Sequence, residues 1–135
     1  MKIDKVLLDE LTQQAQNSPR LRMNFDLRTS SQDHSQRMLN AVEPGTVVPI
    51  HRHMMSTEVV ILLRGKVRQN IYDENGCLTQ SEICEAGGDN FGFSVPVGVW
   101  HNMESLESGT VFMDCKDGAY APLTEDDVMT IPKVI

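Results

Sequence analysis

The chain contains few of the residues and segments that mark several large classes of protein. Only three of its 135 residues are cysteines, none of them in a Cys-x-x-Cys pair, and we expect all three to be reduced. No apolar run approaches the roughly 18 residues that a membrane span requires. Basic residues are outnumbered, because 12 lysines and arginines face 19 acidic residues and the net charge is −7. An acidic chain is a poor partner for nucleic acid or an anionic membrane, so we expect neither.

The beginning of the sequence has no apolar segment of the kind found in secretory signals. The stretch KIDKVLLDELTQ is too charged for that role, so we expect a cytoplasmic protein. A length of 135 residues suits one domain with an adequate core. Within it we expect an N-terminal helix and lead-in over residues 1–35, a β-barrel over 36–121, and a peripheral tail over 122–135.

The sequence predicts one helix followed by many short strands. A helix over residues 4–16 has Asp4 as its cap and carries Leu7, Leu11 and Ala15 along one face, which we expect to pack outside a barrel. From Gln36 onward, β-branched segments alternate with turns that contain glycine. The expected strands cover residues 36–43, 46–53, 58–64, 66–73, 77–84, 90–96, 99–106 and 110–117. This pattern predicts an all-β sandwich or closed barrel.

Three of the four histidines fall into a pattern suited to binding a metal. His51 and His53 are separated by one residue, and side chains at i and i+2 of a strand point to the same face. Glu58 follows the short link MMST and opens the next predicted strand, which we expect beside that of the two histidines. His101, after the turn PVG, is expected on a third strand that returns toward them. His34 lies in a polar loop, and we do not count it as a ligand.

These four ligands indicate a particular kind of metal site. Imidazole and carboxylate groups suit one divalent transition metal, which could be zinc, iron, manganese, nickel or copper. The absence of thiolate ligands argues against a closed structural zinc site. Octahedral coordination would leave two positions for water or substrate, as Lewis-acid chemistry requires.

A basic group precedes the predicted barrel. Arg20, Arg22 and Arg28 cluster with Asn24, and in an acidic protein such a group could bind a phosphate or a carboxylate. An ordinary solvated segment is the alternative.

Other residues could line a substrate pocket. Asn40 is expected to point inward from its strand, and Lys116 and Tyr120 lie in the segment KDGAY. They could bind substrate or transfer a proton, although a structural role is the alternative for each. Met54, Met55 and Met103 could form an apolar wall of the pocket or could pack elsewhere.

Two stretches resemble the motifs of a known superfamily. Gly45-x5-His51-x-His53-x4-Glu58-x6-Gly65 matches the first cupin motif at every fixed position. Pro96-x-Gly98-x2-His101 matches the core of the second motif, while Asn90 and Ser105 depart from its pattern. The resemblance implies a double-stranded β-helix, the cupin jelly-roll barrel, with metal at His51, His53, Glu58 and His101. It also implies a homodimer, because cupins often pair.

A narrower resemblance covers most of the chain. The stretches SPRLRMNFDL, QRMLNAVEPGT and KDGAYAPLTEDD are similar to those of the WbuC-type cupin metalloproteins, which are found among polysaccharide (O-antigen) biosynthesis genes. This implies a metal-dependent enzyme, of isomerase or epimerase type, acting on a small sugar-like or nucleotide-sugar-derived molecule. A metal-dependent dioxygenase and a non-catalytic cupin that binds a small ligand are the alternatives. No catalytic acid or base is assigned.

Overall fold

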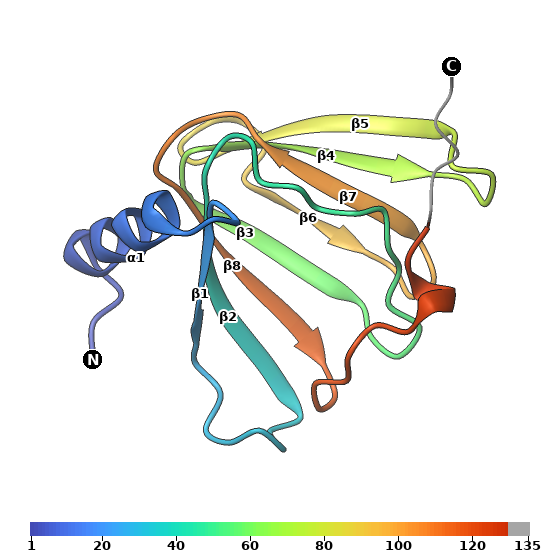
Figure 1. Ribbon diagram of the computed structural model, residues 1–135, viewed down its shortest axis with the longest axis horizontal. Helices are drawn as coiled ribbons and strands as arrows, with labels where there is room; N and C mark the ends of the chain where they lie inside the picture. Colours follow the sequence, from blue (N-terminus) through green and yellow to red (C-terminus); the bar gives the residue numbers. More distant parts are fainter. Residues whose placement is uncertain (130–135) are drawn as a thin grey trace.

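The computed structural model describes residues 1–129, which form one helix, eight strands and a short 3-10 turn (Figure 1). The elements are α1 (Lys5–Asn17), β1 (Arg22–Asp26), β2 (Ser35–Val42), β3 (Glu58–Arg64), β4 (Lys66–Tyr72), β5 (Leu78–Glu85), β6 (Gly92–Val95), β7 (Trp100–Ser105), β8 (Thr110–Asp117) and η1 (Glu125–Asp127).

The strands form two antiparallel sheets. The order is β1-β2-β8-β3-β6 in the five-stranded sheet and β5-β4-β7 in the three-stranded sheet. Side chains alternate between the two faces of each strand. On β3 the alternation places Glu58, Val60 and Leu62 inside. The residues between them, Val59, Ile61 and Leu63, face outward. The all-β prediction with an N-terminal helix is therefore confirmed.

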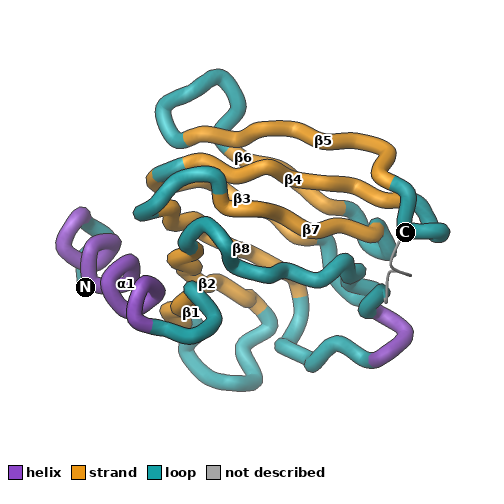
Figure 2. The backbone as a smooth tube through the Cα atoms, turned by 45° about the horizontal axis from the view of Figure 1, so that its top comes forward, coloured by secondary structure: helices purple, strands orange, loops and turns teal. Residues whose placement is uncertain are grey.

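The helix covers part of the outer face of the five-stranded sheet, beside β1 and β2 (Figure 2). Asp4 caps it, because its carboxylate accepts a hydrogen bond from the Leu7 amide at 3.1 Å. Its buried residues Leu8, Leu11 and Ala15 pack on apolar side chains of β2 and β8. The predicted packing outside the barrel is confirmed, with Leu8 more deeply buried than Leu7.

A second apolar cluster fills the space between the sheets. It comprises Val42, Val60, Leu62, Val67, Cys84 and Phe112. All three cysteines are free. No helix within residues 1–129 is long and apolar enough to cross a membrane.

Two segments differ from the sequence prediction. Residues 46–53 were expected to form a strand, but only His51 makes isolated bridges, to His101 and Val128. Pro49 has no amide hydrogen to donate to a ladder, which interrupts pairing in this segment. Glu58 does open β3, but β3 pairs with β6 and β8 and not with the histidine segment. Conversely, Arg22–Asp26, which the sequence left unassigned, pairs with β2 as β1.

The last described segment lies against the histidine segment. The amide of Arg52 donates to Asp127 O at 3.0 Å, and the amide of Met129 donates to Ile50 O at 2.8 Å. The Arg52 guanidinium also pairs with the Asp127 carboxylate and lies 4.5 Å from the ring centroid of Trp100. These contacts hold His51 between β7 and the C-terminal segment. The segment contains the 3-10 turn η1, where the Thr124 hydroxyl donates to the Asp127 carboxylate and caps no backbone amide.

Candidate metal centre

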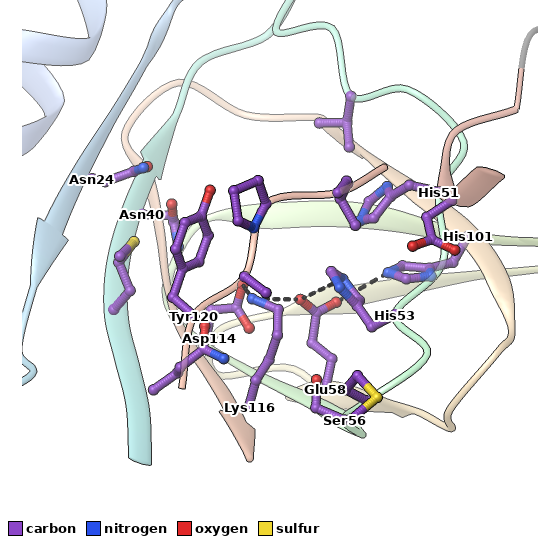
Figure 3. Close-up of a pocket in the computed structure, with 18 of the residues that line it drawn as sticks. Asn24, Asn40, His51, His53, Ser56, Glu58, His101, Asp114, Lys116 and Tyr120 are labelled. Carbon is purple, nitrogen blue, oxygen red and sulfur yellow. Dashed lines mark hydrogen bonds and ion pairs between the residues drawn. The ribbon is translucent and has the colours of Figure 1, made fainter. Parts of the chain in front are cut away.

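Three histidine side chains converge at one end of the cavity between the sheets (Figure 3). The backbones of His51 and His101 exchange two hydrogen bonds, of 3.0 and 2.9 Å, which fixes the relative positions of the two residues. The ring centroid of His51 lies 4.9 Å from that of His53 and 4.3 Å from that of His101. One ligand atom from each of the three residues lies within 4.8 Å of the others. A single ion could therefore contact all three rings.

The hydrogen bonds of the rings leave nitrogen lone pairs available for a metal. His51 Nδ1 lies 2.8 Å from Pro49 O, and His101 Nδ1 lies 2.9 Å from Val99 O. A carbonyl can only accept, so Nδ1 carries the proton in both rings. His53 Nε2 is buried without a hydrogen-bond partner in the described structure. Burial lowers the pKa of His51 and lowers the pKa of His53 to about 4, which favours the neutral form that metal binding requires.

Glu58 lies beside the three histidines and is almost fully buried. Its Oε1 is 3.2 Å from His101 Nε2, and its Oε2 is 3.7 Å from His53 Nε2. His101 thus has an acceptor at each ring nitrogen, so either a proton or a metal cation must lie between Nε2 and the carboxylate. Burial opposes ionisation of Glu58, but the hydrogen bond from His101 and the charge of Lys116 outweigh it and lower the pKa. The residues present therefore fit a divalent cation.

Two charged residues of β8 adjoin Glu58 (dashed lines, Figure 3). Lys116 Nζ lies 3.4 Å from Glu58 Oε2 and 3.3 Å from Asp114 Oδ2. Burial raises the pKa of Asp114 to about 7, and the charge of Glu58 adds to this effect. For Lys116, burial opposes the charged form, but the two carboxylates more than compensate and raise its pKa.

Asp114 is a site residue that the sequence analysis missed. The alternation in TVFMDCKD provides the available signal, because it puts Phe112, Asp114 and Lys116 on the same face of β8.

One cavity of about 870 Å³ brings all the predicted site residues together. Its lining includes the predicted ligands and pocket candidates Arg22, Asn24, Asn40, His51, His53, Glu58, His101, Lys116 and Tyr120. In Figure 3 the amides of Asn24 and Asn40 lie on the side opposite the histidines, and Tyr120 lies near Asn40. Met54, Met55 and Met103 also line the cavity, whereas Trp100 does not and packs against Arg52.

Solved structures with the same architecture identify the fold. KdgF from Halomonas sp. matches with a TM-score of 0.60 and 13% identity, over 75% of this chain and 82% of that one. Oxalate oxidase in complex with glycolate matches with a TM-score of 0.59 and 18% identity, over 76% of this chain and 53% of that one. A mutant of Bacillus subtilis oxalate decarboxylase matches with a TM-score of 0.52 and 23% identity, over 64% of this chain and 22% of that one. These likenesses show the cupin jelly-roll fold, and the two oxalate enzymes are much longer than the region matched.

Sequence comparisons identify the family. Among curated proteins, none matches this chain. The family model described as "Domain of unknown function (DUF6016)" matches residues 3–84, which include His51, His53 and Glu58. That match covers more than half of the chain, and the protein therefore belongs to the DUF6016 family.

Proposed function

We propose that this protein is a metal-dependent cupin enzyme that acts on a small sugar-like or nucleotide-sugar-derived substrate. The observation that carries the proposal is the convergence of three imidazoles, with the Glu58 carboxylate beside them, at one end of a cavity of about 870 Å³. One divalent transition metal is held by His51, His53, His101 and Glu58. When bound, that metal polarises a substrate oxygen as a Lewis acid, which suits isomerisation or epimerisation.

The chain's own polar residues position the ligands and the substrate. Lys116 bonds to Glu58 and Asp114 and so fixes the orientation of the Glu58 carboxylate. Across the cavity, the amides of Asn24 and Asn40 and the phenol of Tyr120 offer donors and acceptors to substrate hydroxyls. This combination of amides and a phenol is suited to a molecule rich in hydroxyl groups.

The resemblance to the WbuC-type cupins supports a place for this enzyme in polysaccharide (O-antigen) biosynthesis. Under this proposal the chain is a single cytoplasmic domain whose partners are small molecules, with neither nucleic acid nor membrane among them. The acidic net charge of −7 agrees with that choice of partners.

A homodimer completes the proposal. Beside the helix, Val59, Ile61 and Leu63 project from the outer face of β3 and are exposed, as is Phe91 ahead of β6. An exposed apolar patch on a sheet face suits association with the same patch of a second copy. Light scattering should give the mass of a dimer for the parent and of a monomer for Ile61→Asp. A monomeric parent would contradict this part of the proposal.

An oxidation of the substrate is the second candidate function. It draws on the likeness to oxalate oxidase, whose structure holds the substrate analogue glycolate, and on a ligand set that suits redox metals. The identity of the metal separates the two candidates. Iron, copper or manganese together with oxygen uptake would favour an oxidation, whereas zinc, or turnover without oxygen uptake, would favour sugar isomerisation.

Elemental analysis tests the central claim. The protein as purified should contain about one equivalent of a divalent metal, because three imidazoles that one ion could contact lie beside the Glu58 carboxylate. His51→Ala and His101→Ala should lose it. His34→Ala is the matched control, since this exposed histidine is not one of the converging rings. Absence of metal in the parent, even after reconstitution, would contradict the enzyme proposal and favour a non-catalytic cupin that binds a small ligand.

A further inference from the structure

The end of the cavity formed by β1 and β2 is basic. Arg22 and Asn24 lie on the inner face of β1, in register with Val42 and Asn40 of β2. Arg22 and Asn24, together with Arg20, also line a smaller adjoining cavity of about 270 Å³. The basic group predicted from the sequence is therefore part of the pocket that contains the histidines.

Arg20 and Arg22 differ from the other arginines in forming no ion pair within residues 1–129. The chain has seven arginines, and the other five each form an ion pair with an aspartate or glutamate. Within residues 1–129, neither Arg20 nor Arg22 has a carboxylate at ion-pair distance, and the guanidinium of Arg22 donates no hydrogen bond. Burial lowers the pKa of Arg22 and the neighbouring charge of Arg20 lowers it further, while the more distant charge of Asp114 acts in the opposite direction without reaching ion-pair distance. Although the chain has 19 acidic residues, the half-buried guanidinium of Arg22 thus has no ion-pair partner among residues 1–129 in this cavity.

Arg28 contributes another unused donor to the same cavity. Its Nε and Nη2 bind the Asp26 carboxylate, with the Nη2 contact at 2.7 Å. Its Nη1 is buried and has no hydrogen-bond partner in the part of the chain that the structure describes. The guanidinium carbon lies 5.7 Å from the ring centroid of Tyr120, another lining residue. A buried donor of this kind favours a ligand that carries an acceptor.

The backbone that directs these arginines is strained and firmly held. Leu21, between Arg20 and Arg22, has a φ of 57° and is the one residue other than glycine with positive φ in residues 1–129. Its carbonyl accepts hydrogen bonds from the Glu43 amide at 2.9 Å and the Thr46 hydroxyl at 2.8 Å. Such conformations persist where surrounding contacts enforce them, and they cluster at functional sites.

We propose that the substrate carries an oxyanion, either a phosphate or a carboxylate, and that Arg22 binds this group at the β1 end of the cavity. This inference rests on the proposed function. The planar fork of a guanidinium donates two parallel hydrogen bonds to either group. Arg20 adds positive charge, and Arg28 Nη1 and the Asn24 amide add donors. The substrate is therefore bifunctional: oxygen atoms at one end reach the metal, and an anionic group at the other reaches the arginines.

Calorimetric titration with inorganic phosphate and with acetate tests this inference on the protein as purified. Losing a charge-assisted hydrogen bond should make Arg22→Gln bind the preferred anion about tenfold or more weakly. The anion affinity of Arg22→Lys should lie between those of the parent and Arg22→Gln, because lysine keeps the positive charge but lacks the paired N–H donors of a guanidinium. Arg68→Gln is the matched control, since Arg68 lies outside the cavity and pairs with Glu104, and its anion affinity should equal that of the parent.

The two anions and the metal content separate the possible outcomes. Tighter binding of phosphate would assign a phosphate-bearing substrate, and tighter binding of acetate would assign a sugar acid. If neither anion binds, or if Arg22→Gln and the parent bind equally, the inference is wrong, whatever the metal content. If anion binding depends on Arg22 while the parent takes up no metal, the inference stands and the enzyme proposal fails. Removing an unpaired, half-buried cation should leave the melting temperature of Arg22→Gln no lower than that of the parent.

Discussion

The two ends of the cavity differ in the charge of the group that they are suited to bind. At the metal end, acceptors and lone pairs converge: Glu58 faces His101 and His53, and Lys116 bridges Glu58 to Asp114. At the β1 end, Arg20 and Arg22 line the cavity, and within residues 1–129 neither has a carboxylate at ion-pair distance. The first end is arranged to accept a cation and the second to accept an anion. A substrate that satisfies both must carry complementary groups at its two ends, which narrows the candidates more than either end alone.

The largest expected effect comes from neutralising the carboxylate at the metal end. Glu58→Gln keeps the shape of the side chain but removes the anionic ligand. Metal affinity should fall by more than the roughly 10- to 100-fold that loss of an outer-shell partner costs. Competition with a chromophoric chelator measures this. Equal affinity in the parent and in Glu58→Gln would show that Glu58 is not a ligand and that the three histidines hold the metal without it.

Local spacing explains why the sequence could predict most of the metal end. His51 and His53 lie two residues apart, and Glu58 and His101 follow recognisable turns, so short motifs contain the information. Asp114 has no such signature, because its surroundings depend on long-range register. The pairing of β3 with β8 places Lys116 opposite Glu58 and Asp114 opposite Val60.

The two strand errors have local causes of different kinds. The segment 46–53 contains hydrophobic and β-branched residues that favour a strand, but Pro49 has no amide hydrogen to donate and only His51 makes β-bridges. The segment RMNFD has weak strand propensity by itself, yet it becomes β1 because the edge of β2 and the buried face of α1 cover it. Tertiary contacts decided that element, so the pocket role of Arg22 and Asn24 depended on a strand that the sequence did not predict.

An intermediate effect is expected from removing the positive charge of Lys116, which lies between the Glu58 and Asp114 carboxylates at the metal end. Lys116→Met leaves Glu58 and Asp114 close together without their shared counter-charge. We expect the metal-free protein to lose about 2 kcal/mol of unfolding free energy, because a partly buried ion pair is broken. Affinity for a divalent metal should rise, since a positive charge beside the site is removed. Urea unfolding with and without chelator measures both, and weaker metal binding would instead show that Lys116 is needed to orient Glu58.

The smallest expected effect concerns a buried carboxylate away from the cavity, Glu43, whose partners are uncharged. Burial opposes its ionisation, but hydrogen bonds donated by the Ser108 hydroxyl, by the Gly109 amide at 2.7 Å and by the Gln16 amide at 3.1 Å outweigh this and lower its pKa. Glu43→Gln should therefore cost about 1 kcal/mol of unfolding free energy at neutral pH and leave the metal content unchanged.

The pH dependence of that cost follows from the lowered pKa of Glu43. A group whose pKa is lower in the folded state contributes its full stabilisation above its unfolded pKa, and that stabilisation is lost as pH falls through the folded pKa. Unfolding free energies of the parent and Glu43→Gln should therefore differ at neutral pH and converge in acid. A difference that stays constant with pH would mean that packing of the side chain, and not its charge, holds the start of β8 against α1. Loss of metal in Glu43→Gln would mean that the metal end depends on this distant contact.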